Sequence, residues 1–192
     1  LTVAVTDDGL FENTETVEAI INSPSDIAIY IADNSATASI TDNDNAPGSI
    51  DADLSVDTHG DEDGPVSVVY AVTLSTTNNT GQAIDFDIQA TGGSATAGSD
   101  YTSFVAGTIS VPDGSAAGTL TVNIADDALF ENDETVQATI SNPSDAAINI
   151  NTASATANIY DNDNGAGSVG ASLGVAMQGD EKLPSLKTLQ AE

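Results

Sequence analysis

The sequence has 192 residues, of which 30 are acidic and only two are lysine or arginine, so its formal net charge is −28. Such a chain offers no basic surface for phosphate groups, which excludes nucleic-acid binding and attraction to anionic membranes. It contains no cysteine, which excludes disulfide bonds, thiolate metal sites and thiol catalysis. With 40% hydrophobic residues it can still build a core, and no stretch is apolar for long enough to predict membrane insertion.

The sequence repeats itself with a period of about 119 residues. LTVAVTDDGLFENTETVEAIINSPSD, starting at residue 1, aligns without a gap with LTVNIADDALFENDETVQATISNPSD, starting at residue 120. Similarity at a fixed period is typical of a tandem array of domains. We therefore divide the chain into the C-terminal part of one repeat (1–46), a complete repeat (47–165), and the start of a following repeat or a divergent tail (166–192). The chain is expected to be cut out of phase, as a fragment of a longer array or as a fibre subunit.

Two-residue alternation of apolar and polar side chains dominates the complete repeat. The predicted strands, in chain order, cover about 52–56, 68–74, 84–88, 108–111, 120–124, 136–140 and 155–159. Glycine, asparagine, aspartate and proline separate them, and these are turn residues. Short strands at this spacing predict an all-β, immunoglobulin-like sandwich.

Acidic residues gather in four clusters, each near the end of a predicted strand. The first lies within 57–63, the second is Asp100, the third lies within 126–134 and the fourth within 161–163. Alternate turns of an antiparallel sandwich lie at the same end, so we expect the four clusters to meet at one pole. The alternative is a generally acidic, solvated surface. That surface would also place acids along the strands, whereas residues 64–84 contain none.

Converging carboxylates need a counter-charge. Two of them 4 Å apart repel by roughly 1 kcal/mol in water and by about 4 kcal/mol at an effective dielectric of 20. Residues 1–181 contain no lysine or arginine that could neutralise them. Ca²⁺ takes roughly six to eight oxygen ligands in loose geometry, whereas zinc prefers histidine and cysteine, which are nearly absent. The composition of the clusters therefore favours calcium.

Several motifs give the sequence a resemblance to the Calx-beta family of calcium-binding β-sandwich repeats. They are ATAGSDY at 95–101, DDALFENDE at 126–134, ISNP at 140–143 and IYDND at 159–163. The resemblance implies Ca²⁺ as the ion and, in the complete repeat, ligation by Glu62, Asp100, Asp126, Asp127, Glu131, Asp161 and Asp163. In the first segment it implies ligation by Asp7, Asp8, Glu12, Asp42 and Asp44, and in the third by Glu181.

Two neighbouring features qualify this predicted ligand set. Ala128 and Asn162 interrupt runs of acids that calcium-sensing members of the family carry, so a smaller ion cluster is expected. Asp133 and Glu134 are interpreted as solvated or turn-forming residues rather than as ligands.

The sequence as a whole predicts a non-enzymatic, calcium-stabilised structural repeat of a large prokaryotic protein that is secreted or held at the cell surface. Its expected role is that of an extender, an adhesin stalk or an extracellular fibre, with calcium ions and neighbouring repeats or copies of itself as partners. Two alternatives stay open: an adhesion module that binds polysaccharide or a surface protein, and a calcium sensor domain. Catalysis is disfavoured because His59, the single histidine, has no motif that supplies a nucleophile.

Overall fold

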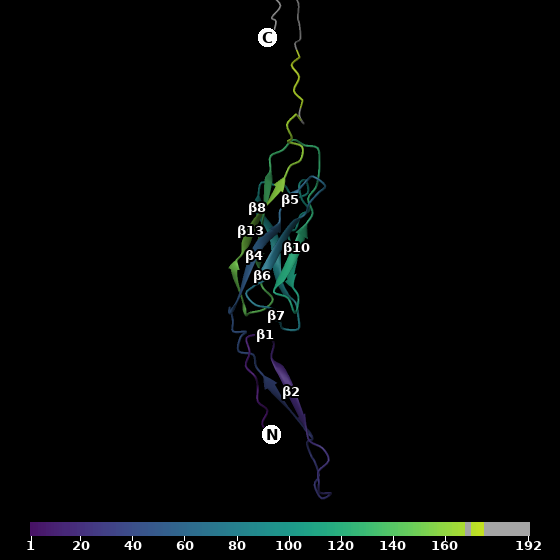
Figure 1. Cartoon of the computed structure of the whole chain (residues 1–192), viewed down its shortest axis with the longest axis vertical. Helices are drawn as coiled ribbons and strands as arrows, with labels where there is room; N and C mark the ends of the chain where they lie inside the picture. The colour runs from purple at the N-terminus through teal and green to yellow at the C-terminus, as the bar shows by residue number, and fades with distance from the viewer. Residues whose placement is uncertain (168–169, 175–192) are drawn as a thin grey trace, which may run out of the picture.

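The computed structural model describes residues 1–167 and 170–174 (Figure 1). Their secondary structure consists of strands and turns, which confirms the predicted all-β class. None of these residues forms a helix that is long and apolar enough to cross a membrane. Residues 50–160 build a sandwich of two sheets, and residues 1–46 lie at one end of it (Figure 1).

The first sheet holds four strands in the order β10–β6–β4–β12. They are β10 (Ala117–Val122), β6 (Val68–Leu74), β4 (Ile50–Thr58) and β12 (Ile148–Thr152). β10 and β4 both pair antiparallel with β6. β12 pairs in parallel with β4 and is missing from the predicted strands, although its isoleucines alternate with asparagines in the two-residue pattern of a strand.

The second sheet holds five strands in the order β5–β13–β11–β8–β9. They are β5 (Gly60–Asp61), β13 (Ser154–Tyr160), β11 (Glu134–Ser141), β8 (Ile84–Gly93) and β9 (Gly107–Val111). β11 is the central strand and pairs antiparallel with both β13 and β8. The short β5 adds in parallel to the end of β13, so the turn that follows β4 lies beside the C-terminal end of the sandwich.

The core fills the space between the two sheets with the inward-facing residues of each strand. In β6, the side chains of Val68, Tyr70 and Val72 are fully buried, as the alternation predicts. The Tyr70 hydroxyl crosses the core and donates a hydrogen bond of 2.7 Å to the backbone carbonyl of Val136 in β11. A buried hydroxyl without a hydrogen bond would destabilise the fold, so this bond satisfies the hydroxyl and also connects the two sheets.

Gly118 marks the place where an edge strand of one sheet meets an edge strand of the other. β10 and β9 are these edge strands. A Cβ atom at Gly118 would overlap the backbone carbonyl group of Ser110 in β9. Only glycine therefore allows the two backbones to approach so closely, and this side of the sandwich is closed.

Residues 1–46 form three strands: β1 (Phe11–Glu12), β2 (Glu15–Ile20) and β3 (Ser35–Ile40). β2 and β3 pair antiparallel, and β1 pairs in parallel with β7 (Asn78–Asn79) of the sandwich. Apolar side chains that are buried in the sandwich are exposed here.

Val3 and Val5 show this difference in burial. They are 54% and 63% exposed, whereas Val122 and Ile124, one period later, are 3% and 7% exposed. Within residues 1–46 no second sheet covers this apolar face. The division of the chain at residues 46 and 165 stays a prediction.

Candidate metal centre

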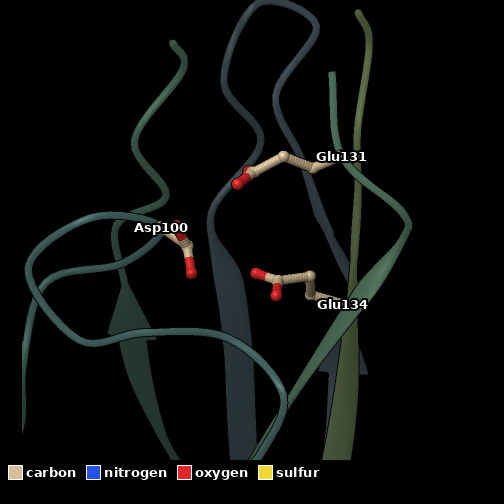
Figure 2. A group of neighbouring side chains, drawn as sticks. All are labelled: Asp100, Glu131 and Glu134. Carbon is tan, nitrogen blue, oxygen red and sulfur yellow. The ribbon is translucent and has the colours of Figure 1, made fainter. Parts of the chain in front are cut away.

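Three carboxylates come together at the pole of the sandwich that lies away from residues 1–46. They belong to Asp100, Glu131 and Glu134, and one oxygen of each lies within 4.8 Å of the others. Figure 2 shows the three side chains pointing toward a common centre. Asp100 comes from the connection between β8 and β9, Glu131 from the connection between β10 and β11, and Glu134 opens β11.

Asp100 is fixed by a tight turn within ATAGSDY. Gly98 has a φ of 92°, which a residue with a side chain rarely adopts, so glycine is required in this turn. The backbone N–H of Thr96 donates to the Asp100 carboxylate, and the Asp100 N–H donates to the Thr96 carbonyl at 3.0 Å. The N–H of Ala125 donates to the Asp100 carbonyl at 2.9 Å, which joins this turn to the loop after β10. The carboxylate is therefore held nearly buried, with 7% exposed.

Glu62 brings the first acidic cluster to the same pole. Its backbone N–H donates to the Tyr160 carbonyl at 3.0 Å, which continues the pairing of β5 with β13. The side chain is only 5% exposed. Burial, followed by the charges of Asp161, Asp127 and Glu131, raises the pKa of Glu62 from 4.5 to about 7.

The other two glutamates at this pole are perturbed in the same direction. Burial raises the pKa of Glu134 to about 7, with further contributions from its hydrogen bond to Asp100 and from the charges of Asp100, Glu131 and Glu62. The pKa of Glu131 is raised by burial and then by the charges of nearby aspartates. For all three glutamates burial is the largest cause of the raised pKa and the charges of neighbouring carboxylates add to it, so the ionised forms are disfavoured at this pole.

The fourth cluster is joined to the third by hydrogen bonds. The Glu131 N–H donates to the Asp161 carboxylate at 3.1 Å, and the Asn162 side-chain amide donates to the Asp126 carboxylate at 3.1 Å. The N–H of Asp163 donates to the other oxygen of Asp161 at 3.0 Å. Carboxylates from all four predicted clusters are thus brought to one pole.

The pole has the chemistry of a site for a hard cation. The Oδ2 atom of Asp163 is buried and has no hydrogen-bond partner among the residues that the structure describes, although buried polar atoms in folded proteins are normally satisfied. The N–H of the same residue bonds to the Asp161 carboxylate, and no lysine or arginine occurs in residues 1–181. A divalent ion with oxygen preference would supply both the missing partner and the missing charge, so the residues present fit Ca²⁺.

A second acidic group lies in residues 1–46, one period earlier. Asp7, Asp8, Glu12 and Asp42 line a cavity of about 500 Å³ together with Glu15. Burial and the charges of Asp8, Glu15 and Asp42 raise the pKa of Glu12.

Asp44 does not line this cavity, but its N–H donates to the Asp42 carboxylate at 3.1 Å. Glu181, the ligand predicted for the third segment, lies outside the described residues.

Glu134 is a candidate ligand outside the predicted set. The structure places it half-buried at the start of β11 and in the cluster with Asp100 and Glu131, rather than in a turn. The sequence does contain a signal, because Glu134 has the same strand parity as the buried Val136 and Ala138. Asp133 has the opposite parity and is exposed, so that part of the interpretation agrees with the structure.

Fold and site together define a β-sandwich domain with a cation-binding acidic pole. The family model of the Calx-beta domain matches residues 1–44 and 56–163, and the chain belongs to this family. Calx-beta domains bind Ca²⁺, and the acidic cluster is suited to it. Both the predicted family and the predicted ion are confirmed.

Solved structures with a similar fold include domains of the Calx protein. The apo form of the Calx CBD1 domain is 22% identical, with a TM-score of 0.48, over 59% of this chain and 98% of that chain. The calcium binding domain CBD12 of CALX1.1 is 22% identical, with a TM-score of 0.47, over 57% of this chain and 44% of that chain. The Calx CBD2 domain is 11% identical, with a TM-score of 0.44, over 58% of this chain and 86% of that chain. No curated protein sequence matches the chain.

Proposed function

We propose that the chain is a calcium-stabilised structural part of a secreted or cell-surface protein, an extender, stalk or fibre without enzymatic activity. The observation that carries the proposal is the convergence of carboxylates from four separate segments at one pole without a lysine or arginine among residues 1–181. In an enzyme, an acidic pair works beside a substrate cleft. Here the acids are hydrogen-bonded to the loops that carry them, which suits a structural ion.

Calcium at this pole would be held by Asp100, Glu131 and Glu134, with Glu62, Asp161 and Asp163 close by. The ion supplies two positive charges and accepts oxygen ligands in variable number. The protein residues bring the connection between β8 and β9 against the connection between β10 and β11, and the ion would hold the two together. Because it binds only the folded arrangement, it stabilises the fold by mass action.

The acidic group around Glu12 supports a structural role in the junction between residues 1–46 and the sandwich. Asp42 lies in this group, and the chain continues from it through Asn45 into β4. An ion bound there would restrict the bending of the short connection. Calcium sites of extracellular modules have dissociation constants of roughly 10⁻⁴–10⁻³ M, so a location outside the cell, where calcium is abundant, suits such sites.

The test is thermal unfolding of the full chain in calcium and in excess EDTA. At a calcium concentration of about 100 times the dissociation constant, binding contributes about 2.7 kcal/mol, which corresponds to a shift of roughly 5–10 °C. We expect EDTA to lower the melting temperature by this amount, and excess Mg²⁺ not to restore it. An unchanged melt in EDTA would refute the proposal. Saturation at micromolar calcium with a change of conformation would instead favour the sensor alternative.

A further inference from the structure

Phe11 of the first segment is buried in the core of the sandwich formed by the following one. Its side chain is 1% exposed and belongs to the same cluster of buried residues as Ile50 and Val111. Phe11 and Glu12 form β1, which pairs in parallel with Asn78 and Asn79 of β7 (Figure 1). The side chain of Asn13 then donates a 2.6 Å hydrogen bond to the Thr80 carbonyl.

The part of the sandwich that receives Phe11, which we call the base (residues 78–82 and 111–115), is organised by its own hydrogen bonds. Asn78 is fully buried, and its side-chain amide donates to the carbonyls of Gln82 and Val111 at 2.7 and 3.1 Å. Its side-chain oxygen accepts hydrogen bonds from the N–H and the hydroxyl of Thr80. These contacts lie within residues 47–165, so the base does not depend on Phe11 for its shape.

The loop that carries Phe11 recurs one period later with the same internal hydrogen bonds. In the first segment the Leu10 N–H donates to Asp8 and the Glu12 N–H donates to Asp42. One period later the Leu129 N–H donates to Asp127 and the Glu131 N–H donates to Asp161. The distance from the Glu12 nitrogen to Asp42 and that from the Glu131 nitrogen to Asp161 are both 3.1 Å. The two loops therefore share these two hydrogen bonds, although residues 11–12 form a strand and residues 130–131 do not.

The two loops differ in the burial of one side chain. Phe11 is 1% exposed, whereas Phe130 is 63% exposed. The preceding leucine differs much less: Leu10 is 43% exposed and Leu129 is 58% exposed. Seating the loop in a base thus buries the phenylalanine and leaves the leucine partly exposed. Because two of the hydrogen bonds that shape the docked loop already exist around Phe130, docking would have less of this loop to order.

We propose that Phe130, Glu131 and Asn132 form a docking plug for the base of a following copy of the repeat, as Phe11, Glu12 and Asn13 dock in the base of residues 47–165. The inference rests on the proposed function, in which such domains follow one another along the molecule. The proposal defines the interface between the two repeats. The Phe130 side chain enters the core of the following repeat, Glu131 pairs with a strand of that repeat, and the Asn132 side chain donates a hydrogen bond to one of its backbone carbonyls. The partner that receives Phe130 is a repeat of the same family with a base equivalent to residues 78–82.

A first experiment uses the full chain. Truncating a buried phenylalanine leaves a cavity, so Phe11→Ala should lower the melting temperature of the sandwich by roughly 10 °C or more. Leu10→Ala is the matched control, because this side chain is already 43% exposed in the docked loop, and it should change the melting temperature little. Equal effects of the two substitutions would overturn the docking role of Phe11.

The second experiment supplies the missing base. An additional copy of residues 46–164 is inserted after Asn164, which keeps the period and places a base next to Phe130. The chain contains four tyrosines but no tryptophan, so Phe130→Trp introduces a single tryptophan emitter that can be excited apart from the tyrosines. Its exposure can then be measured with a soluble quencher. We expect several-fold protection in the extended chain relative to the original chain, and no comparable gain for Leu129→Trp. Phe130→Ala provides a second readout, since it should lower the melting temperature by roughly 10 °C in the extended chain only.

The outcomes separate this proposal from the proposed function. If the emitter of the Phe130→Trp variant stays open to the quencher and Phe130→Ala has no effect in the extended chain, docking is wrong, whatever EDTA does. If docking is seen but EDTA leaves the melt unchanged, the calcium role is wrong and the interface stands.

Discussion

A carboxylate oxygen of Glu134 lies within 4.8 Å of a carboxylate oxygen of Asp100, although the two residues are far apart in the sequence. Glu134 begins the central strand β11, and Asp100 belongs to the turn before β9. The two side chains share a hydrogen bond, which together with burial raises the pKa of Glu134. Folding thus brings together carboxylates that repel when ionised.

The first prediction concerns the removal of one of these charges. In EDTA at pH 8, Glu134→Gln should raise the free energy of unfolding by about 1 kcal/mol, because it removes repulsion among close carboxylates. With calcium the same substitution should weaken ion binding by roughly tenfold, because a charged ligand is lost. Urea denaturation and calorimetric titration measure the two effects. Asp133→Asn is the control, since Asp133 is exposed beside the cluster, and an equal response there would indicate a general charge effect.

The second prediction is a dependence of stability on pH in the absence of calcium. The pKa values of Glu62 and Glu134 rise from 4.5 to about 7 on folding. Between these pH values the folded chain binds protons that the unfolded chain has lost. The contribution of these two groups to the free energy of unfolding is therefore fully present below about pH 4.5 and is lost as the pH rises through 7. Melting in EDTA across this range should show the fall.

With calcium present this fall should be offset as the pH rises toward 7, because the ion binds the same carboxylates as they lose their protons. The double variant Glu62→Gln, Glu134→Gln should flatten the EDTA profile. A profile with the original slope in that variant would show that other groups control the pH dependence.

The third prediction tests the contact between the two sheet edges. Gly118→Ala should destabilise the sandwich by about 1–3 kcal/mol, because the added methyl group must push the backbone of β9 away from β10. Chemical denaturation in calcium measures the loss. Gly165→Ala is the matched control, because a Cβ atom there meets no other atom within 4 Å, and a similar loss in both variants would contradict the steric explanation.

Strand positions in the sandwich were predictable because burial follows the two-residue period. Ile84, Phe86 and Ile88 are buried, while the alternating Asp85 and Asp87 are exposed. β12 escaped prediction because it is held by its parallel partner β4 rather than by its own composition. Its isoleucines favour a strand and its asparagines favour a turn, so the local pattern is ambiguous and pairing with β4 decides the outcome.

The convergence of the acids was also predictable, since antiparallel strands return alternate turns to one pole. Glu134 escaped prediction because it follows several polar residues, which conceal its strand parity. The different burial of Phe11 and Phe130 could not be predicted, because the two residues lie in nearly identical sequence. The burial of a side chain at the end of a domain depends on the segment that packs against it, and the local sequence motif does not specify that segment.

The closed edge at Gly118 has a consequence for a chain that repeats its own sequence. Every free strand edge in such a molecule finds matching strands in the adjacent domains at high local concentration, which favours exchange of strands and misfolded assemblies. Because β9 and β10 shield each other's backbones, this edge is withdrawn from such pairing. A side chain at position 118 would therefore do more than destabilise one domain. By separating β9 from β10 it would leave two strand edges open to pairing with strands of neighbouring copies.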